Sequence, residues 1–390
     1  MKLLLIIFTI ALNCPIAKSQ GLKVINQNYS EALKIASQEN KLIFIDFYTT
    51  WCAPCKKLDK LIFENDSIGN SIKKNFVFLK YDAEKDTVYN LSKKHHISSY
   101  PTGLILNKDG FVINRRFGFS GNDFNTLSEN VNKFTIEAIE LNNENKHIKG
   151  YSNVVDISKY PDFYIKYINR QKLNIDSTEF LNYWKNNKDY LSEEYFATLM
   201  YFGTSTPNFV SDLAELNKNK YEQLFGIPET EILFYMLSNS KMNYAVATKN
   251  KNDYEKAVDY TKRNLSEKWT KTMIPNFEID FLKSQKMWNE VYKIRDKSKE
   301  EGKLDYDDIN SFCYEAYMEC EDKKVLSKFA NWMKEVTKKE PTYAYLDTYA
   351  FLLFKADRKL EAKKIANLAV GAAKKENKKT KDLEELLQKL

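Results

Sequence analysis

Histidine and cysteine are scarce in this sequence of 390 residues, which has 3 histidines and 5 cysteines. A zinc site needs four ligands at short, characteristic spacings. The sequence has a single C-x-x-C pair, Cys52 and Cys55, and no histidine follows it at such a spacing. A covalent haem site needs a histidine directly after the pair, and Lys56 stands there instead. We therefore predict no bound metal and no cofactor.

Long apolar runs are also missing after the N-terminus. The run Leu3–Leu12 is about half as long as the roughly 20 residues that a membrane-spanning helix needs. Lys2 precedes this run and Ala17-Lys18-Ser19 follows it, which is typical of a signal peptide over residues 1–19. We expect an exported protein, periplasmic or secreted, with no membrane span in the mature chain. A lipoprotein anchored at Cys14 is the alternative, which its two neighbours disfavour.

Charge of one sign does not dominate. Lys and Arg number 60 against 53 Asp and Glu, so the formal net charge is +7, and it falls to +5 without residues 1–19. Nucleic-acid-binding domains concentrate Lys and Arg on one face, whereas here Lys alternates with Glu, Asp and Asn. We expect no nucleic-acid partner. The Lys-rich segment 374–381 indicates a solvated helix end, with a phosphate or membrane contact as the alternative.

Apolar and aromatic residues are plentiful, at 43% and 14%, so this length predicts two or three folded domains. In residues 20–141, strand and helix patterns alternate, which predicts an α/β domain. The expected strands are Leu42–Tyr48, Phe76–Tyr81, Thr102–Leu106 and Gly110–Arg116. The expected helices are Ser30–Gln38, a stretch from Cys52 to Phe63, Val88–His96 and Asn125–Leu141.

The second part of the chain has a different pattern. Residues 142–156 include a polar stretch that ends in Gly150 and are the predicted linker, and residues 157–390 are predicted to be all helical. Apolar positions recur there at intervals of 34, 35 and 36 residues: Ala257, Val291, Leu326 and Ala362. This period resembles that of tetratricopeptide repeats. We expect an α-solenoid of stacked helix pairs that offers a surface to a protein partner; an irregular helical bundle is the alternative.

The C-x-x-C pair opens a predicted helix. A catalytic cysteine must be ionised and reachable by a second sulfur. Cys52, at the helix start, faces unpaired N–H groups and the positive end of the helix dipole, which favour the thiolate. Cys55, one turn further in, is expected to be more buried and to act as the resolving thiol. A purely structural disulfide is the alternative.

Cys313 and Cys320 lie seven residues apart in a strongly helical pattern. Seven residues of helix span roughly 10.5 Å, beyond the roughly 7 Å limit between bridged Cα atoms. These two residues therefore cannot bond to each other within one helix, and we expect buried thiols.

Two separated motifs carry a family resemblance. The run from Ile45 to Lys56, Ile-Asp-Phe-Tyr-Thr-Thr-Trp-Cys-Ala-Pro-Cys-Lys, and the later Ser99-Tyr100-Pro101-Thr102 resemble the thioredoxin family over about residues 24–141. Within it, the pattern is most similar to exported thioredoxin-like domains, including the periplasmic domain of transmembrane disulfide reductases. The resemblance implies a thioredoxin-like fold and a thiol-disulfide oxidoreductase with a redox-active Cys52–Cys55 disulfide. It also implies disulfide-containing protein clients and an upstream thiol electron donor.

The resemblance also implies roles for single residues. Pro101 corresponds to the cis-proline that faces the disulfide, and Tyr100 would offer its backbone to an extended substrate. Asp46 matches the buried carboxylate behind the active site; burial would raise its pKa, so that it exchanges a proton with Cys55. Lys80 is its candidate charge partner.

A rim of further residues is expected around the sulfurs. Trp51, Pro54, Tyr100 and Gly118, the last within Phe117-Gly118-Phe119, are the predicted substrate-binding residues. Pro54 favours a reducing site, and Ala53 replaces the glycine common in thioredoxins. A protein-binding scaffold, in which this domain mainly docks proteins, is the alternative function. A thiol peroxidase would use a lone reactive cysteine, and the intact pair argues against it.

Overall fold

The computed structural model describes residues 22–171 and 176–390. By its contacts the chain divides into two compact units between Leu237 and Ser238, within helix α11 (Ile227–Thr248). The strands are β1 (Val24–Asn26), β2 (Leu42–Tyr48), β3 (Phe76–Asp82), β4 (Thr102–Leu106) and β5 (Val112–Phe117). The helices before α11 are α1 (Tyr29–Glu39), α2 (Ala53–Leu58), α3 (Asp66–Asn75), α4 (Leu91–Lys94), α5 (Phe124–Asn143), α6 (Asp162–Ile168), α7 (Ser177–Asn186), α8 (Glu193–Phe202), α9 (Asn208–Leu216) and α10 (Lys218–Phe225). Short helical turns are η1 (Asp59–Phe63), η2 (Ala83–Lys85), η3 (Ile157–Lys159) and η4 (Gly203–Ser205).

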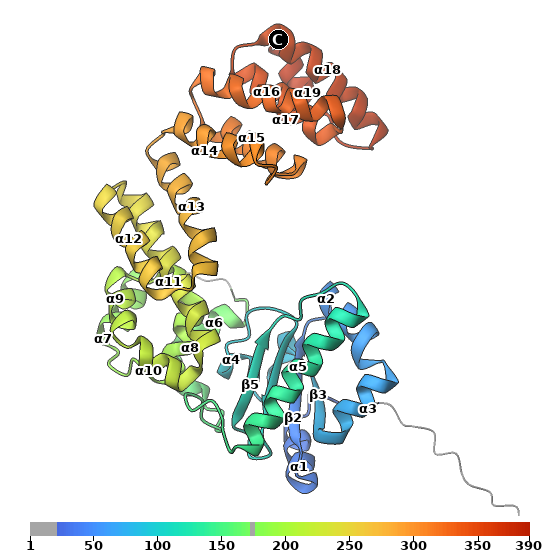
Figure 1. Ribbon diagram of the computed structural model, residues 1–390, viewed down its shortest axis with the longest axis vertical. Coiled ribbons are helices and arrows are strands. Elements are labelled where there is room, and N and C mark those ends of the chain that lie inside the picture. The colour runs from blue at the N-terminus through green and yellow to red at the C-terminus, as the bar shows by residue number, and fades with distance from the viewer. Residues whose placement is uncertain (1–21, 172–175) are drawn as a thin grey trace, which may run out of the picture. The chain divides into compact units, whose positions relative to one another are not determined.

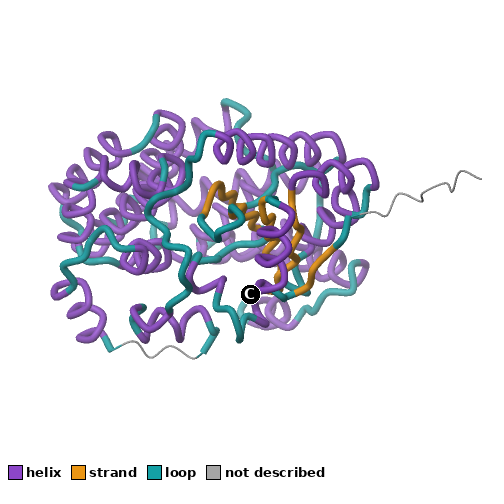
Figure 2. The backbone as a smooth tube through the Cα atoms, turned by 90° about the horizontal axis from the view of Figure 1, so that it is seen from below, coloured by secondary structure: helices purple, strands orange, loops and turns teal. Residues whose placement is uncertain are grey.

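The five strands form one sheet in the order β1-β3-β2-β4-β5 (Figure 1). Strands β1, β3 and β2 run parallel to one another, whereas β4 runs antiparallel to both of its neighbours, β2 and β5. Figure 2 shows these strands gathered in one place, with helix and loop in the rest of the described chain. The predicted α/β fold, followed by an all-helical region, is therefore confirmed.

Strand β2 places a polar side chain beneath α2. Successive residues of a strand point to opposite faces of the sheet, so Phe44 and Asp46 share a face. The Phe44 ring packs edge-on against Phe63 and Phe134, at centroid distances of 5.7 and 5.5 Å. Helices α2, α3 and α5 contribute to the same core as Phe44. Asp46, two residues further along, therefore lies under the helix that carries Cys55.

The helical segment after α5 packs on α4 and on the loop that follows it. The Tyr164 hydroxyl donates to the carbonyl of Lys93, and the Tyr201 hydroxyl to that of Ile97. Lys94, buried in this packing, forms an ion pair with Glu193 at 2.8 Å. Helices α6 and α8 thus belong to the same compact unit as the sheet. The linker at 142–156 stays a prediction. The division into two compact units falls later in the chain, between Leu237 and Ser238.

Helix α4 is much shorter than the helix predicted over Val88–His96. It begins after Asn90 and ends at Lys94, because Asn90 and His96 both have left-handed backbones, with φ of 53° and 38°. His95 and His96 are both buried. The buried residues of this segment contact α6 and α8 instead, through Tyr164 and Phe196.

The second unit consists of helices. They are the end of α11, then α12 (Lys251–Asn264), α13 (Glu267–Ser284), α14 (Trp288–Glu300), α15 (Tyr306–Glu319), α16 (Lys323–Lys339), α17 (Tyr343–Lys355), α18 (Lys359–Lys375) and α19 (Lys381–Gln388). The four residues of the repeat pattern fall in alternate helices, α12, α14, α16 and α18, and all four are buried. Cys313 and Cys320, in α15 and at its C-terminal end, are free and buried, as expected.

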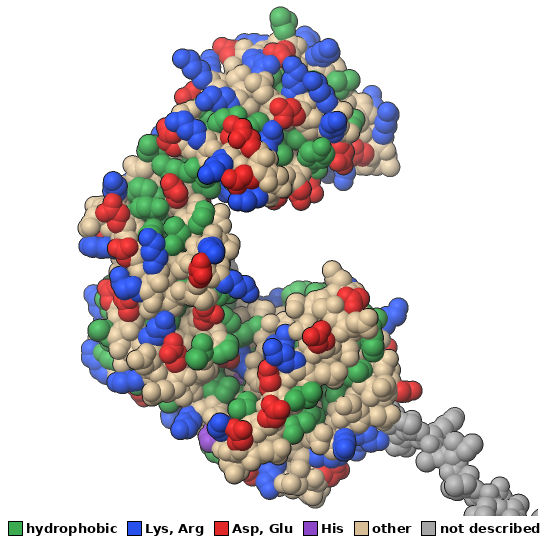
Figure 3. All heavy atoms as spheres, viewed as in Figure 1, with side chains coloured by type: hydrophobic (Ala, Val, Ile, Leu, Met, Phe, Trp, Pro, Cys, Tyr) green, Lys and Arg blue, Asp and Glu red, His purple; other side chains and the backbone are tan. Residues whose placement is uncertain are grey.

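None of the helices in the described part of the chain is both long and apolar enough to cross a membrane. On the face drawn in Figure 3, Lys and Arg side chains are interspersed with Asp and Glu. This mixture agrees with the alternation of charges along the sequence.

Candidate active site

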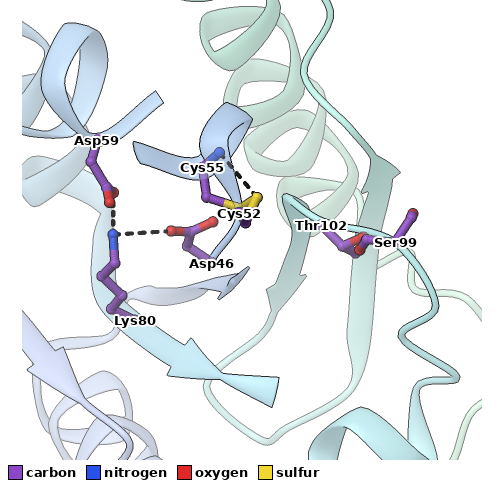
Figure 4. Close-up of a disulfide and its surroundings, with 7 residues drawn as sticks. All are labelled: Asp46, Cys52, Cys55, Asp59, Lys80, Ser99 and Thr102. Atoms are coloured by element: carbon purple, nitrogen blue, oxygen red, sulfur yellow. Dashed lines mark hydrogen bonds and ion pairs between the residues drawn. A yellow bond between two sulfur atoms is a disulfide. The ribbon is translucent and has the colours of Figure 1, made fainter. Parts of the chain in front are cut away.

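A disulfide joins Cys52 and Cys55 at the start of α2, with 5.3 Å between the two Cα atoms (Figure 4). Cys52 is the residue before the helix and has an extended backbone, whereas Cys55 lies in the first turn. The Cys52 sulfur accepts a hydrogen bond from the backbone N–H of Cys55 at 3.1 Å. Its sulfur therefore faces the unpaired donors at the helix start, where negative charge on a thiolate is stabilised.

The disulfide is less accessible than the sequence predicted. Cys52 is 3% exposed and Cys55 2% exposed, so the expected difference in burial is absent from the oxidised form. The bond to Cys55 holds the Cys52 sulfur against the first turn of α2, which accounts for its low exposure. By contrast, the adjacent Trp51 is 58% exposed. The position of this ring therefore bears directly on access to the sulfurs.

Below α2 lies a buried carboxylate with a lysine beside it. Asp46 is 1% exposed and pairs in register with Lys80 of β3, whose Nζ lies 3.6 Å from Asp46 Oδ2 (Figure 4). Burial raises the pKa of Asp46 to about 7, although Lys80 acts to lower it. Among the described residues, Asp46 Oδ1 has no hydrogen-bond partner. This oxygen is thus free to take a proton near neutral pH.

A second carboxylate, Asp59, was missed by the sequence analysis. Lys80 donates a hydrogen bond to Asp59 Oδ1, so one ammonium group serves both carboxylates (Figure 4). The Asp59 charge acts to raise the pKa of Asp46. Asp59 lies four residues after Cys55, which places both on one face of a continuing helix. That spacing is the signal that would have found it.

The loop before β4 forms the other side of the site. The Tyr100–Pro101 peptide bond is cis, and the Pro101 carbonyl accepts a hydrogen bond from the N–H of Gly118 at 2.8 Å. Gly118 has φ +70°, a left-handed conformation that glycine adopts without cost. The Tyr100 and Trp51 rings meet edge-on at 6.0 Å. Thr102 Oγ1 donates to the Ser99 carbonyl at 2.8 Å, which stabilises the loop.

The structure thus places the predicted residues around one disulfide. Pro54 is exposed in the first turn of α2, on the outside of the site. Phe119, expected at the rim with Gly118, is instead 8% exposed and packs against Phe134 of α5. Phe117 carries Arg115 over its ring, at 4.4 Å from the centroid. Gly118 is therefore the residue of this segment that bonds to the loop of Tyr100 and Pro101.

Comparison with known proteins assigns this domain. Residues 24–108 match a family described as Thioredoxin-like. A thioredoxin of Echinococcus granulosus is 33% identical over 99 residues, which are 24% of this chain and 82% of that protein. The chain belongs to the thioredoxin family. With its C-x-x-C disulfide, it is a thiol-disulfide oxidoreductase.

Two further similarities concern this thioredoxin domain. A solution structure from Bacteroides thetaiotaomicron, assigned provisionally as a disulphide isomerase, is 37% identical; the match covers 30% of this chain and 97% of that one, with a TM-score of 0.27. The thiol:disulfide interchange protein DsbD of Pseudoalteromonas atlantica is 26% identical over 88 residues, which are 22% of this chain and 15% of that protein.

Proposed function

We propose that the protein is an exported disulfide reductase that acts on protein disulfides. The observation that carries this proposal is the Cys52–Cys55 disulfide at the start of α2, with the buried Asp46 beneath it and the loop of Tyr100 and Pro101 in contact with Trp51 beside it. The first two supply an attacking thiolate and a proton acceptor. The third supplies a backbone edge for an extended client.

The reaction starts from the reduced pair. The Cys52 thiolate attacks one sulfur of the client disulfide, a mixed disulfide forms, and the other client sulfur leaves as a thiolate. Asp46 accepts the proton of Cys55, and the Cys55 thiolate then attacks the Cys52 sulfur. The client leaves with both sulfurs reduced, and the protein holds the disulfide drawn in Figure 4. An upstream dithiol donor returns two electrons and completes the cycle.

The direction and the location are supported by sequence features. Pro54 between the cysteines favours a reducing site, and the similarity to the thiol:disulfide interchange protein DsbD agrees with thiol-disulfide exchange. The apolar run and cleavage site within residues 1–19, which lie outside the described residues, support export. N-terminal sequencing of the protein from its native host tests this point: we expect the mature chain to begin at Gln20. An intact Met1 would contradict export by this signal.

The helical region is proposed to bind a protein partner through a tetratricopeptide-like solenoid. The recurrence of buried positions in alternate helices, at intervals close to the 34 residues of that repeat, supports this assignment. A Cys55→Ala variant traps the mixed disulfide on Cys52, so that clients are recovered covalently and identified by mass spectrometry. Trapping with and without residues 238–390 tests whether the second unit selects them.

Insulin reduction by the purified mature chain tests the enzyme proposal. With a thiol donor, the wild type is expected to precipitate insulin B chain much faster than Cys52→Ala. Equal rates over a range of donors would favour the alternative, a binding scaffold whose thioredoxin domain only docks proteins. The exposed Trp51 and the backbone of Tyr100 would serve either role, so the rate comparison decides between them.

A further inference from the structure

Arg170, in the turn that ends α6, lies against the residue before the attacking cysteine. Its guanidinium carbon is 5.4 Å from the centroid of the Trp51 ring. Its Nη2 is 3.0 Å from Oε1 of Glu84, and the same oxygen accepts the indole N–H of Trp51 at 3.0 Å. Each of these three side chains thus contacts the other two. One of them comes from the helical segment that follows the thioredoxin domain.

The backbone at Arg170 does not favour an arginine. Its φ is 54°, and the N–H groups of Arg170 and Gln171 donate to the carbonyls of Tyr167 and Lys166 at 3.0 Å each. This is the hydrogen-bond pattern of a helix end at which glycine is the usual residue, because a side chain is strained there. A glycine at position 170 would therefore remove the side chain and leave this turn unstrained.

A groove begins at the same place. Its volume is about 460 Å³, and it is lined by Ile97 and Tyr100 of the loop before β4 and by Tyr167, Arg170 and Tyr201 of the helical segment. Tyr100 directly precedes the cis-proline, so the groove is continuous with the edge at which an extended client would pair. A polypeptide that pairs with the Tyr100 backbone would run into this groove, whereas a small disulfide would not reach it.

We propose that Arg170 is a positioning residue of the redox site, which fixes the Trp51 ring and forms the second wall of a groove for the client segment next to the attacked cysteine. The inference rests on the proposed reduction of protein disulfides and extends it. It makes the helical segment part of the client-binding surface. The exchange of sulfurs and electrons is unchanged, because Arg170 acts through Trp51 and the client chain.

An Arg170→Gly variant of the full mature chain tests this inference without weakening the turn. The KM for insulin is expected to rise about three- to tenfold, the size expected from losing one exposed cation–π contact and one ion pair. Turnover at saturating insulin is expected to stay within about twofold, because a saturating client offsets weaker binding in the groove. Arg170→Lys keeps the charge and is expected to restore part of the insulin affinity.

Lys286 offers a matched control in the helical region. It has φ 58°, and the N–H groups of Lys286 and Met287 repeat the same helix-end pattern, to Lys283 and Leu282. Lys286→Gly therefore makes the same backbone change at a different turn. It is expected to alter neither the KM for insulin nor the Trp51 emission, which is measured as the difference spectrum against Trp51→Phe.

These experiments test the role of Arg170 separately from the proposed reduction of protein disulfides. An unchanged KM for insulin in Arg170→Gly, with unchanged Trp51 emission, would overturn the role of Arg170. A red-shifted Trp51 emission together with a higher KM supports it. If the wild type reduces neither insulin nor glutathione disulfide, the proposed function itself is wrong. In that case the Trp51 emission of Arg170→Gly still tests whether Arg170 fixes the ring.

Discussion

Cys52 and Cys55 lie three residues apart at the start of α2, whereas Cys313 and Cys320 lie in the middle and at the end of α15. The first pair forms a disulfide. The second pair is free and buried, and the S–H of Cys313 donates to the carbonyl of Phe329 at 3.5 Å. Burial raises the pKa of both Cys313 and Cys320.

The difference between the pairs lies in their surroundings, since the residue type is the same. At the start of a helix, unpaired N–H groups face a sulfur, whereas in the helix interior every N–H is already bonded to a carbonyl. A buried carboxylate lies below the first pair, and apolar residues such as Phe329 and Met333 belong to the core around Cys313. The first pair is therefore suited to thiolate chemistry, and the second to packing.

Removal of the attacking sulfur should have the largest effect. Cys52→Ser is expected to lower insulin reduction by at least about a thousandfold, because no covalent intermediate can form. The double variant Cys313→Ser with Cys320→Ser is expected to keep wild-type activity. Parallel insulin assays measure both. A double variant that is folded and yet as inactive as Cys52→Ser would contradict the contrast between the pairs.

The buried carboxylate should have the next largest effect. Asp46→Asn is expected to slow insulin reduction about ten- to a hundredfold at pH 7, because Cys55 loses its proton acceptor. Asp347 is the matched control: burial raises the pKa of this α17 aspartate to about 6, and it lies outside the redox site. Asp347→Asn is expected to leave the rate unchanged. Equal rates for Asp46→Asn and the wild type would remove Asp46 from the mechanism.

Asp46→Asn should raise the stability of the fold, although it slows the reaction. The pKa of Asp46 is about 7 in the folded protein against an ordinary 3.8, so between these values the folded state holds a proton that the unfolded state has released. Stability contributed by this group is therefore lost as pH rises from about 4 to 7. Urea unfolding of Asp46→Asn should show a gain of about 2–4 kcal/mol at pH 8. At pH 4 the gain should vanish, and a constant gain would contradict the raised pKa.

The packing thiol should have the smallest effect. Cys313 is fully buried, and a serine hydroxyl there costs about 1–2 kcal/mol of unfolding free energy, since a polar group enters an apolar core. Urea unfolding of Cys313→Ser measures this cost, with insulin reduction as the control for an intact redox site. A variant as stable as the wild type would show that the surroundings of Cys313 tolerate a polar group.

Local patterns were enough to predict most of the sheet. The expected strands Leu42–Tyr48 and Thr102–Leu106 have those bounds in the structure, and α5 differs from the expected helix by one residue at its start and two at its end. Strand β1 was missed because three residues are too few for a periodic pattern. Helix α3 was missed although Asn65, whose side chain accepts from two backbone N–H groups, is a usual helix-start residue.

Contacts between distant residues could not be predicted. His96 lies 2.7 Å from the Tyr151 hydroxyl, which donates to Glu229 at the same distance. The three residues are 55 and 78 positions apart, and each is an ordinary polar residue in its local context. The contact of Arg170 with Trp51 likewise joins residues that are far apart in the sequence. Motif spacing places residues within one domain, whereas such contacts depend on how the following helices pack on it.

The reactivity of Cys52 in the reduced native protein tests the central claim most directly. The rate of alkylation by iodoacetamide at pH 6 is followed for each cysteine by mass spectrometry, in the native and in the urea-unfolded chain. Native Cys52 is expected to react at least about tenfold faster than in the unfolded chain, because the helix start favours its thiolate. Cys313 and Cys320 should react far more slowly than when unfolded. A native Cys52 that reacts no faster than in the unfolded chain would contradict the account.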